Sequence, residues 1–164
     1  MSFALNFDEL TGYNQFLANS WREWFQRNPT ALDVPCDIMN TGTVRGLVKH
    51  IFAVELRYAE QLNNRRPPDY EELPDTSLED LYNIRQRAVA SLSEFLAGAS
   101  DASLDEVFEV KTRSAGVLST TRRTIFVHAM MHGSRHWAQL ATLTRQAGYP
   151  SVGYQDYLFY KVGK

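Results

Sequence analysis

The chain has 164 residues, of which 44% are hydrophobic and 22% charged, and its formal net charge at pH 7 is −2. These values are typical of one soluble globular domain, residues 1–164, and they exclude the strongly basic surface of a protein that binds nucleic acid or an anionic membrane. A single cysteine, Cys36, excludes an internal disulfide. The first residues lack the features of a signal peptide, and no apolar run is long enough for a bilayer, so we expect a cytoplasmic protein with neither membrane nor nucleic-acid partners.

The first half of the chain contains two segments with the apolar spacing of amphipathic helices. The first runs from about residue 7 to residue 26, where Asn6 and Glu9 stand at the spacing of a capping box. The second runs from about residue 43 to residue 62 and is ended by Asn-Asn-Arg-Arg-Pro-Pro at residues 63–68. The stretch between these helices reads as a connecting loop.

The second half predicts two more helices, separated by a looser segment. The third helix begins after the N-cap residue Ser77 and ends at Gly98, and the fourth runs from about residue 121 to residue 147. Residues 104–119 form a short hairpin or an irregular segment. The aromatic tail 149–164 packs on the helices as a hydrophobic cover, with a lid over the site or part of a dimer interface as the alternatives. We therefore predict an all-α fold, a four-helix bundle whose inward-facing side chains can build a metal site.

The four histidines of the chain are His50, on the second helix, and His128, His132 and His136, at every fourth position of the last helix. Side chains four apart on a helix lie on nearly the same face, about 6 Å apart along the axis, which suits two imidazoles that share one metal ion. His128 and His136 are about 12 Å apart, too far for metal–nitrogen bonds of about 2 Å. The pair is therefore His132 with one neighbour, and the apolar face of the helix favours His136.

A third ligand from another helix would complete the site, and His50, at the edge of its helix's apolar stripe, is the natural candidate. Three protein ligands with one open position are typical of catalytic zinc. Gln139, one turn beyond His136, and His128 are candidates for groups that orient the ligands. The alternative is that the histidines are ordinary core and surface residues and that Gln139 is a boundary residue facing solvent.

Other chemistry has weaker support. Glu55 and Glu60 could act as general bases, and Arg122, Arg123 and Arg135 could bind an anionic substrate, although such helix residues are commonly solvated. The chain has no GxSxG, no glycine-rich phosphate loop and no paired-cysteine zinc pattern. This disfavours a catalytic triad, nucleotide hydrolysis and dinucleotide binding.

The arrangement resembles the DinB/YfiT-like superfamily of metal-dependent four-helix proteins over most of the chain up to about Gly148. The resemblance rests on His50 and on His132-Gly-Ser-Arg-His136-Trp-Ala-Gln139, followed by an apolar helix end and the glycine. Members typically show His-x-x-x-His followed by Arg-Gly-Gln. Here Trp137-Ala138 replaces Arg-Gly, which puts any role of that arginine in doubt but keeps the histidines and Gln139.

The resemblance implies that His50, His132 and His136 bind one divalent ion, commonly zinc or nickel. Characterised branches include transferases and isomerases that use low-molecular-weight thiols such as mycothiol or bacillithiol, and homodimers are common. We therefore expect a thiol-dependent S-transferase that acts on a small electrophilic substrate. The alternatives are a metal-dependent hydrolase, a non-catalytic metal-braced binding or stress-response protein, and a metal-free bundle that works through partner contacts.

Overall fold

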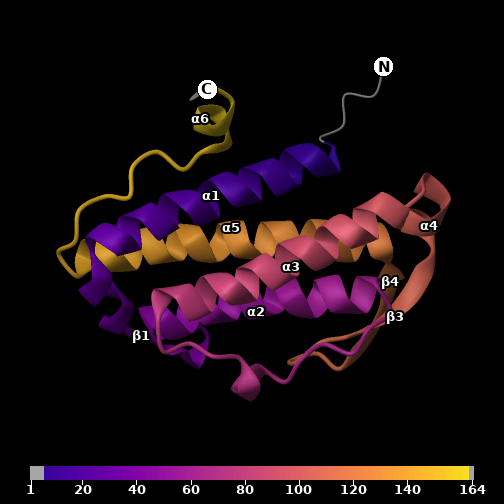
Figure 1. The fold of residues 1–164 in the computed structure, drawn as a ribbon, viewed down its shortest axis with the longest axis horizontal. Coiled ribbons are helices and arrows are strands. Elements are labelled where there is room, and N and C mark those ends of the chain that lie inside the picture. Colours follow the sequence, from indigo (N-terminus) through magenta and orange to yellow (C-terminus); the bar gives the residue numbers. More distant parts are fainter. Residues whose placement is uncertain (1–5, 163–164) are drawn as a thin grey trace. The chain divides into compact units, whose positions relative to one another are not determined.

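The computed structural model describes residues 6–162, and this part of the chain is mostly helical (Figure 1). Its four long helices are α1 (Phe7–Arg27), α2 (Val44–Leu62), α3 (Leu78–Gly98) and α5 (Arg122–Gln146), and two short ones are α4 (Asp101–Asp105) and α6 (Tyr157–Val162). The helical segments predicted from the sequence are thus confirmed to within one or two residues. Within residues 6–162, no helix combines the length and the apolar character needed to cross a bilayer.

The chain divides into two compact units, one made of the residues up to Val48 and from Met130 onward, the other of Lys49–Ala129. Both boundaries fall inside a long helix, so α2 and α5 each contribute to both units.

Aromatic packing between α1 and the second half of α5 forms the core of the first unit. Trp21 is stacked on Trp137, with ring centroids 5.5 Å apart and an interplanar angle of 16°, and both side chains are fully buried. Trp24 packs edge-on against Trp21, and its indole N–H donates to the carbonyl of Pro150. Burial of large aromatic side chains is a major source of stability, so this contact fixes which face of α5 turns inward.

The tail that follows α5 returns to α1 in the same unit. The hydroxyl of Tyr13 donates to the carbonyl of Gln155 over 2.7 Å, and its ring packs edge-on against Tyr157. An ion pair between Lys161 and Glu9 adds to this contact. A Cβ on Gly12 would collide with the hydroxyl of Tyr160, so the small residue permits the close approach of the tail.

The second unit contains a buried ion pair between α2 and α3. Arg85 donates to Glu55 over 2.7 Å, and the two side chains are only 5% and 1% exposed. The guanidinium also lies over the ring of Phe52. A buried charge needs such a partner because desolvation of an isolated ion is costly.

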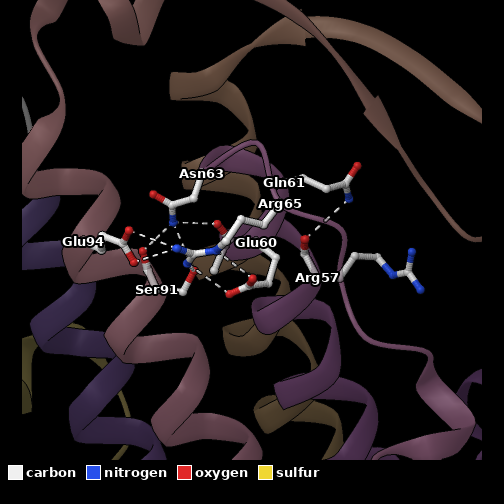
Figure 2. Close-up of polar contacts among 8 residues, drawn as sticks. Arg57, Glu60, Gln61, Asn63, Arg65, Ser91 and Glu94 are labelled. Atoms are coloured by element: carbon white, nitrogen blue, oxygen red, sulfur yellow. Dashed lines mark hydrogen bonds and ion pairs between the residues drawn. The ribbon is translucent and has the colours of Figure 1, made fainter.

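A polar cluster joins the end of α2 to α3 (Figure 2). The guanidinium of Arg65 binds Glu94 at 2.8 and 2.9 Å, Glu60 at 2.9 Å and the hydroxyl of Ser91 at 2.8 Å. The amide of Asn63 donates to the carbonyl of Ser91. These contacts hold the polar segment after α2 against α3. From the sequence this segment was predicted only as the end of a helix.

The segment before α5, predicted as either a short hairpin or an irregular segment, is an antiparallel hairpin. Strand β3 (Val107–Lys111) pairs with β4 (Val117–Thr121), and Gly116, with φ of +72°, supplies the left-handed residue of the turn. The side-chain amide of Gln61 on α2 anchors the hairpin, because its oxygen accepts from the backbone N–H of Lys111 and its nitrogen donates to the carbonyl.

The segment predicted as a plain loop between α1 and α2 is more ordered than expected. It contains the 3-10 helices η1 (Pro29–Asp33) and η2 (Ile38–Asn40) and the two-residue strands β1 (Pro35–Cys36) and β2 (Gly42–Thr43), which pair with each other. Two positive φ angles in η2 reverse the chain between the strands. Between α2 and α3 there is one further turn of 3-10 helix, η3 (Tyr70–Glu72).

The capping box of α3 provides a test of local stability. The hydroxyl of Ser77 accepts from the backbone N–H of Asp80, whose carboxylate accepts from the N–H of Ser77. We expect Ser77→Ala to lower the free energy of unfolding by about 1 kcal/mol in chemical denaturation. Ser93→Ala, at an exposed position of the same helix, is the control, and equal losses in the two variants would contradict the role of the cap.

The contact between α1 and the tail gives a second test. We expect Gly12→Ala to displace Tyr160 and so to increase chymotrypsin cleavage at residues 157–160, measured by mass spectrometry of the fragments. Gly98→Ala is the control, since a Cβ there meets nothing within 4 Å. Unchanged cleavage in Gly12→Ala would show that the tail does not depend on this close approach.

Candidate metal centre

Two histidines one helical turn apart face each other on α5. The Nε2 atoms of His132 and His136 are 3.2 Å apart, and their ring centroids are 4.5 Å apart at an interplanar angle of 71°. His136 is only 1% exposed and His132 is half-buried. Two nitrogens bound tetrahedrally to one zinc ion would be about 3.3 Å apart, given Zn–N bonds of about 2.0–2.1 Å. The spacing therefore suits two ligands of one ion.

The other ring nitrogen of His136 is held by Gln139. Its Nδ1 lies 2.7 Å from the side-chain oxygen Oε1 of Gln139. Because an amide oxygen can only accept, Nδ1 carries the proton and Nε2 keeps its lone pair. This is the way metal-binding histidines are commonly oriented, and Gln139 thus lies where a ligand-orienting group has to be.

The environment of His136 favours its neutral form. Burial lowers the pKa of the imidazole, the hydrogen bond that it donates to Gln139 raises it, and the positive charge of Arg135 lowers the pKa further. A metal ion binds only the neutral imidazole, so protons compete less with a metal here than at an exposed histidine.

His50, on α2, completes the group. One ring nitrogen each from His50, His132 and His136 lies within 4.8 Å of the other two, and His50 is half-buried. All three donors are neutral nitrogens, which zinc and nickel accept well. The three histidines together can hold one divalent metal ion.

The remaining histidine lies elsewhere on α5. His128 is exposed, and its ring packs edge-on against Tyr58 at 5.3 Å. It does not belong to the group of potential ligands, in agreement with the helix geometry that separates it from His136. The suggestion that His128 orients a ligand remains a prediction.

Both glutamates considered as general bases have arginine partners. Glu55 is fully buried and paired with Arg85, while Glu60 accepts from Arg65 over 2.9 Å. Each carboxylate is held by a guanidinium, so neither is available to accept a proton from water as a general base.

Arg122 and Arg123, considered as anion-binding residues, are engaged away from the histidines. Arg122 donates to the carbonyl of Leu62 and to Asn64, and Arg123 pairs with Asp105. These contacts tie the start of α5 to the end of α2 and to α4.

Arg135 contacts the candidate centre in a way that the sequence did not reveal. Its Nη2 lies 3.2 Å from Nε2 of His136, the nitrogen that faces His132. Residues adjacent in a helix point about 100° apart, so helical spacing gives no reason to expect this contact. The long, flexible arginine side chain makes it possible.

Comparison with known proteins adds one finding. The family model described as the DinB family matches residues 1–163, whereas a search of curated proteins found no match. The matched region includes the histidines and extends through the aromatic tail, for which the resemblance of the sequence had offered no counterpart. The chain belongs to the DinB family.

Proposed function

We propose that this protein is a metal-dependent enzyme that transfers a low-molecular-weight thiol to a small electrophile. In this proposal His50, His132 and His136 hold one zinc or nickel ion, and the four long helices form one four-helix bundle in a single domain. The observation that carries it is the pair of Nε2 atoms 3.2 Å apart, one of them fixed as an acceptor by Gln139. A cation shared by the two rings would satisfy the buried lone pair of His136.

The donor set favours thiol chemistry over hydrolysis. A divalent ion bound to three neutral ligands lowers the pKa of a coordinated thiol, so that the thiolate forms near neutral pH without a protein base. A hydrolase needs a base beside its attacking water, and the two candidate glutamates are paired with arginines. The engagement of these carboxylates therefore supports the transferase.

The protein residues have separate tasks in this scheme. The three histidines hold the ion, and Gln139 keeps His136 in the correct tautomer. The sulfur of the thiol forms the new carbon–sulfur bond, and the leaving group of the electrophile departs with the bonding electrons.

Metal content and thiol transfer test the proposal together. Elemental analysis of purified, untagged protein should find about one divalent ion per chain, removed by chelation and restored by zinc or nickel. The loaded protein should accelerate the reaction of bacillithiol or mycothiol with 1-chloro-2,4-dinitrobenzene, measured as thioether absorbance and released chloride. No metal after reconstitution would overturn the site, and metal without transfer of any thiol would favour a non-catalytic, metal-braced protein.

Alanine substitution should separate the two kinds of histidine on α5. We expect His132→Ala to weaken zinc affinity by more than the roughly 10–100-fold typical for loss of a ligand-orienting group, because a direct ligand is removed. His128→Ala, whose ring packs on Tyr58, removes no direct ligand and should leave zinc binding largely intact. Competition titration with a chromophoric chelator measures both, and equal losses would refute the assignment of the pair.

Gln139 provides a test of ligand orientation. We expect Gln139→Leu to weaken zinc affinity by about 10–100-fold, since the acceptor for Nδ1 of His136 is lost. Gln139→Glu keeps an acceptor and should retain affinity. Gln146→Leu, at an exposed position near the end of the same helix, is the control, and a Gln139→Leu variant with unchanged affinity would show that the hydrogen bond plays no part in metal binding.

A further inference from the structure

We propose that strand β4 is a docking surface for a second copy of this chain, whose own β4 pairs with it in the antiparallel direction across a two-fold axis. The two hairpins then form one four-stranded sheet in the order β3–β4–β4–β3. The inference concerns the hairpin of the second unit alone. It goes beyond the proposed function and does not depend on the metal centre.

The hydrogen bonds at the two ends of the hairpin show which backbone groups face outward. The N–H of Thr112 donates to the carbonyl of Gly116, and the N–H of Arg122 donates to the carbonyl of Glu106. Bonded and non-bonded residue pairs alternate along an antiparallel ladder, so the even-numbered pairs between these two contacts are bonded within the hairpin. The N–H and C=O groups of the odd-numbered residues therefore face away from it.

The two edges of the hairpin differ. On β3, the side-chain amide of Gln61 bonds with both outward backbone groups of Lys111, and the strand carries two charged side chains. On β4, the outward backbone groups of Val117 and Ser119 have no partner among residues 6–162. Natural proteins usually protect such an edge with a charged residue or a proline, and the sequence Val-Leu-Ser-Thr-Thr of β4 has neither. An open and uncharged edge is suited to pairing with another strand.

The side chains along this edge are exposed as well. Val117 is 58% exposed and Leu118 is 45% exposed. Single apolar side chains at a surface are ordinary, but these two are adjacent and lie on opposite faces of the hairpin beside the open edge. A strand that is added along β4 covers both faces at once.

The sequence of β4 is complementary to itself in the antiparallel direction. The register that overlaps all five residues centres on Ser119, which then pairs with Ser119 of the second copy. In this register Val117 lies opposite Thr121 on one face, and Leu118 lies opposite Thr120 on the other. Each pair joins an apolar side chain to a β-branched one, and no like charges face each other. The odd-numbered residues pair with one another, so a two-fold related copy also matches the outward donors with acceptors.

Proline and alanine at position 119 test the pairing. Because the N–H of Ser119 faces away from β3, Ser119→Pro removes a donor from the ladder between the copies and none from the hairpin. We expect wild-type protein to show a concentration-dependent monomer–dimer equilibrium in sedimentation velocity. Ser119→Pro should raise the dissociation constant about 10-fold or more, since the two-fold axis doubles the loss. Ser119→Ala keeps the N–H and should behave as the wild type, and the thermal unfolding midpoint verifies that each variant is folded.

Cysteine substitution tests the register without removing a backbone donor. In the two-fold register the Cα atoms of the two Ser119 residues are about 5.5 Å apart, a distance that a disulfide spans. Those of the two Val117 residues are at least about 14 Å apart, because four residues of strand separate them. We expect Ser119→Cys to form a cross-linked dimer under mild oxidation, measured by non-reducing electrophoresis, and Val117→Cys to stay uncross-linked. The native Cys36 is buried and common to both variants.

Three outcomes would overturn the inference. The first is wild-type protein that stays monomeric at every concentration, and the second is a dimer that Ser119→Pro does not weaken. The third is no more cross-linking in Ser119→Cys than in Val117→Cys, because the copies would then meet through another surface or in another register. All three leave the proposed function standing, since no residue of β4 belongs to the group of candidate metal ligands.

Discussion

The hydrogen bond between Nδ1 of His136 and Oε1 of Gln139 is the contact on which the candidate centre depends. An imidazole that is 1% exposed has two ring nitrogens to satisfy, and burial without partners is costly. Gln139 accepts a hydrogen bond from the protonated Nδ1, and this leaves the lone pair on Nε2. If the proton sat on Nε2 instead, the side of His136 that faces His132 would present a donor, and no metal could bind there. A hydrogen bond within one turn of α5 thus sets the tautomer of His136.

Trp137, next to His136, orients the face of α5 that carries His132 and His136. Trp137 stands where family members typically have arginine, and its ring is buried against Trp21 of α1. A tryptophan in this position couples the rotation of α5 to the aromatic core of its unit, and His136 is buried next to it. The packing of Trp137 therefore restricts the rotation of the helix that carries His132 and His136.

The sequence predicted those features that depend on local spacing. The Asn6–Glu9 box, the N-cap Ser77 and the fourfold spacing of His132 and His136 act within one turn of helix, and the structure contains all of them. The two-residue strands β1 and β2 were missed because so short a ladder has no periodicity. The pairing of Glu55 with Arg85 and the contact of Arg135 with His136 were missed because they depend on tertiary packing and on side-chain flexibility, which helical spacing does not encode.

The contact of Arg135 with His136 places a positive charge beside the candidate ligands. Nε2 of His136 lies 3.2 Å from Nη2 of Arg135 and 3.2 Å from Nε2 of His132, so its lone pair can accept from either group. The lone pair of Nε2 serves one partner at a time, so a metal ion bound to this nitrogen would have to displace the guanidinium. Arg135 is exposed, so water can solvate a displaced guanidinium.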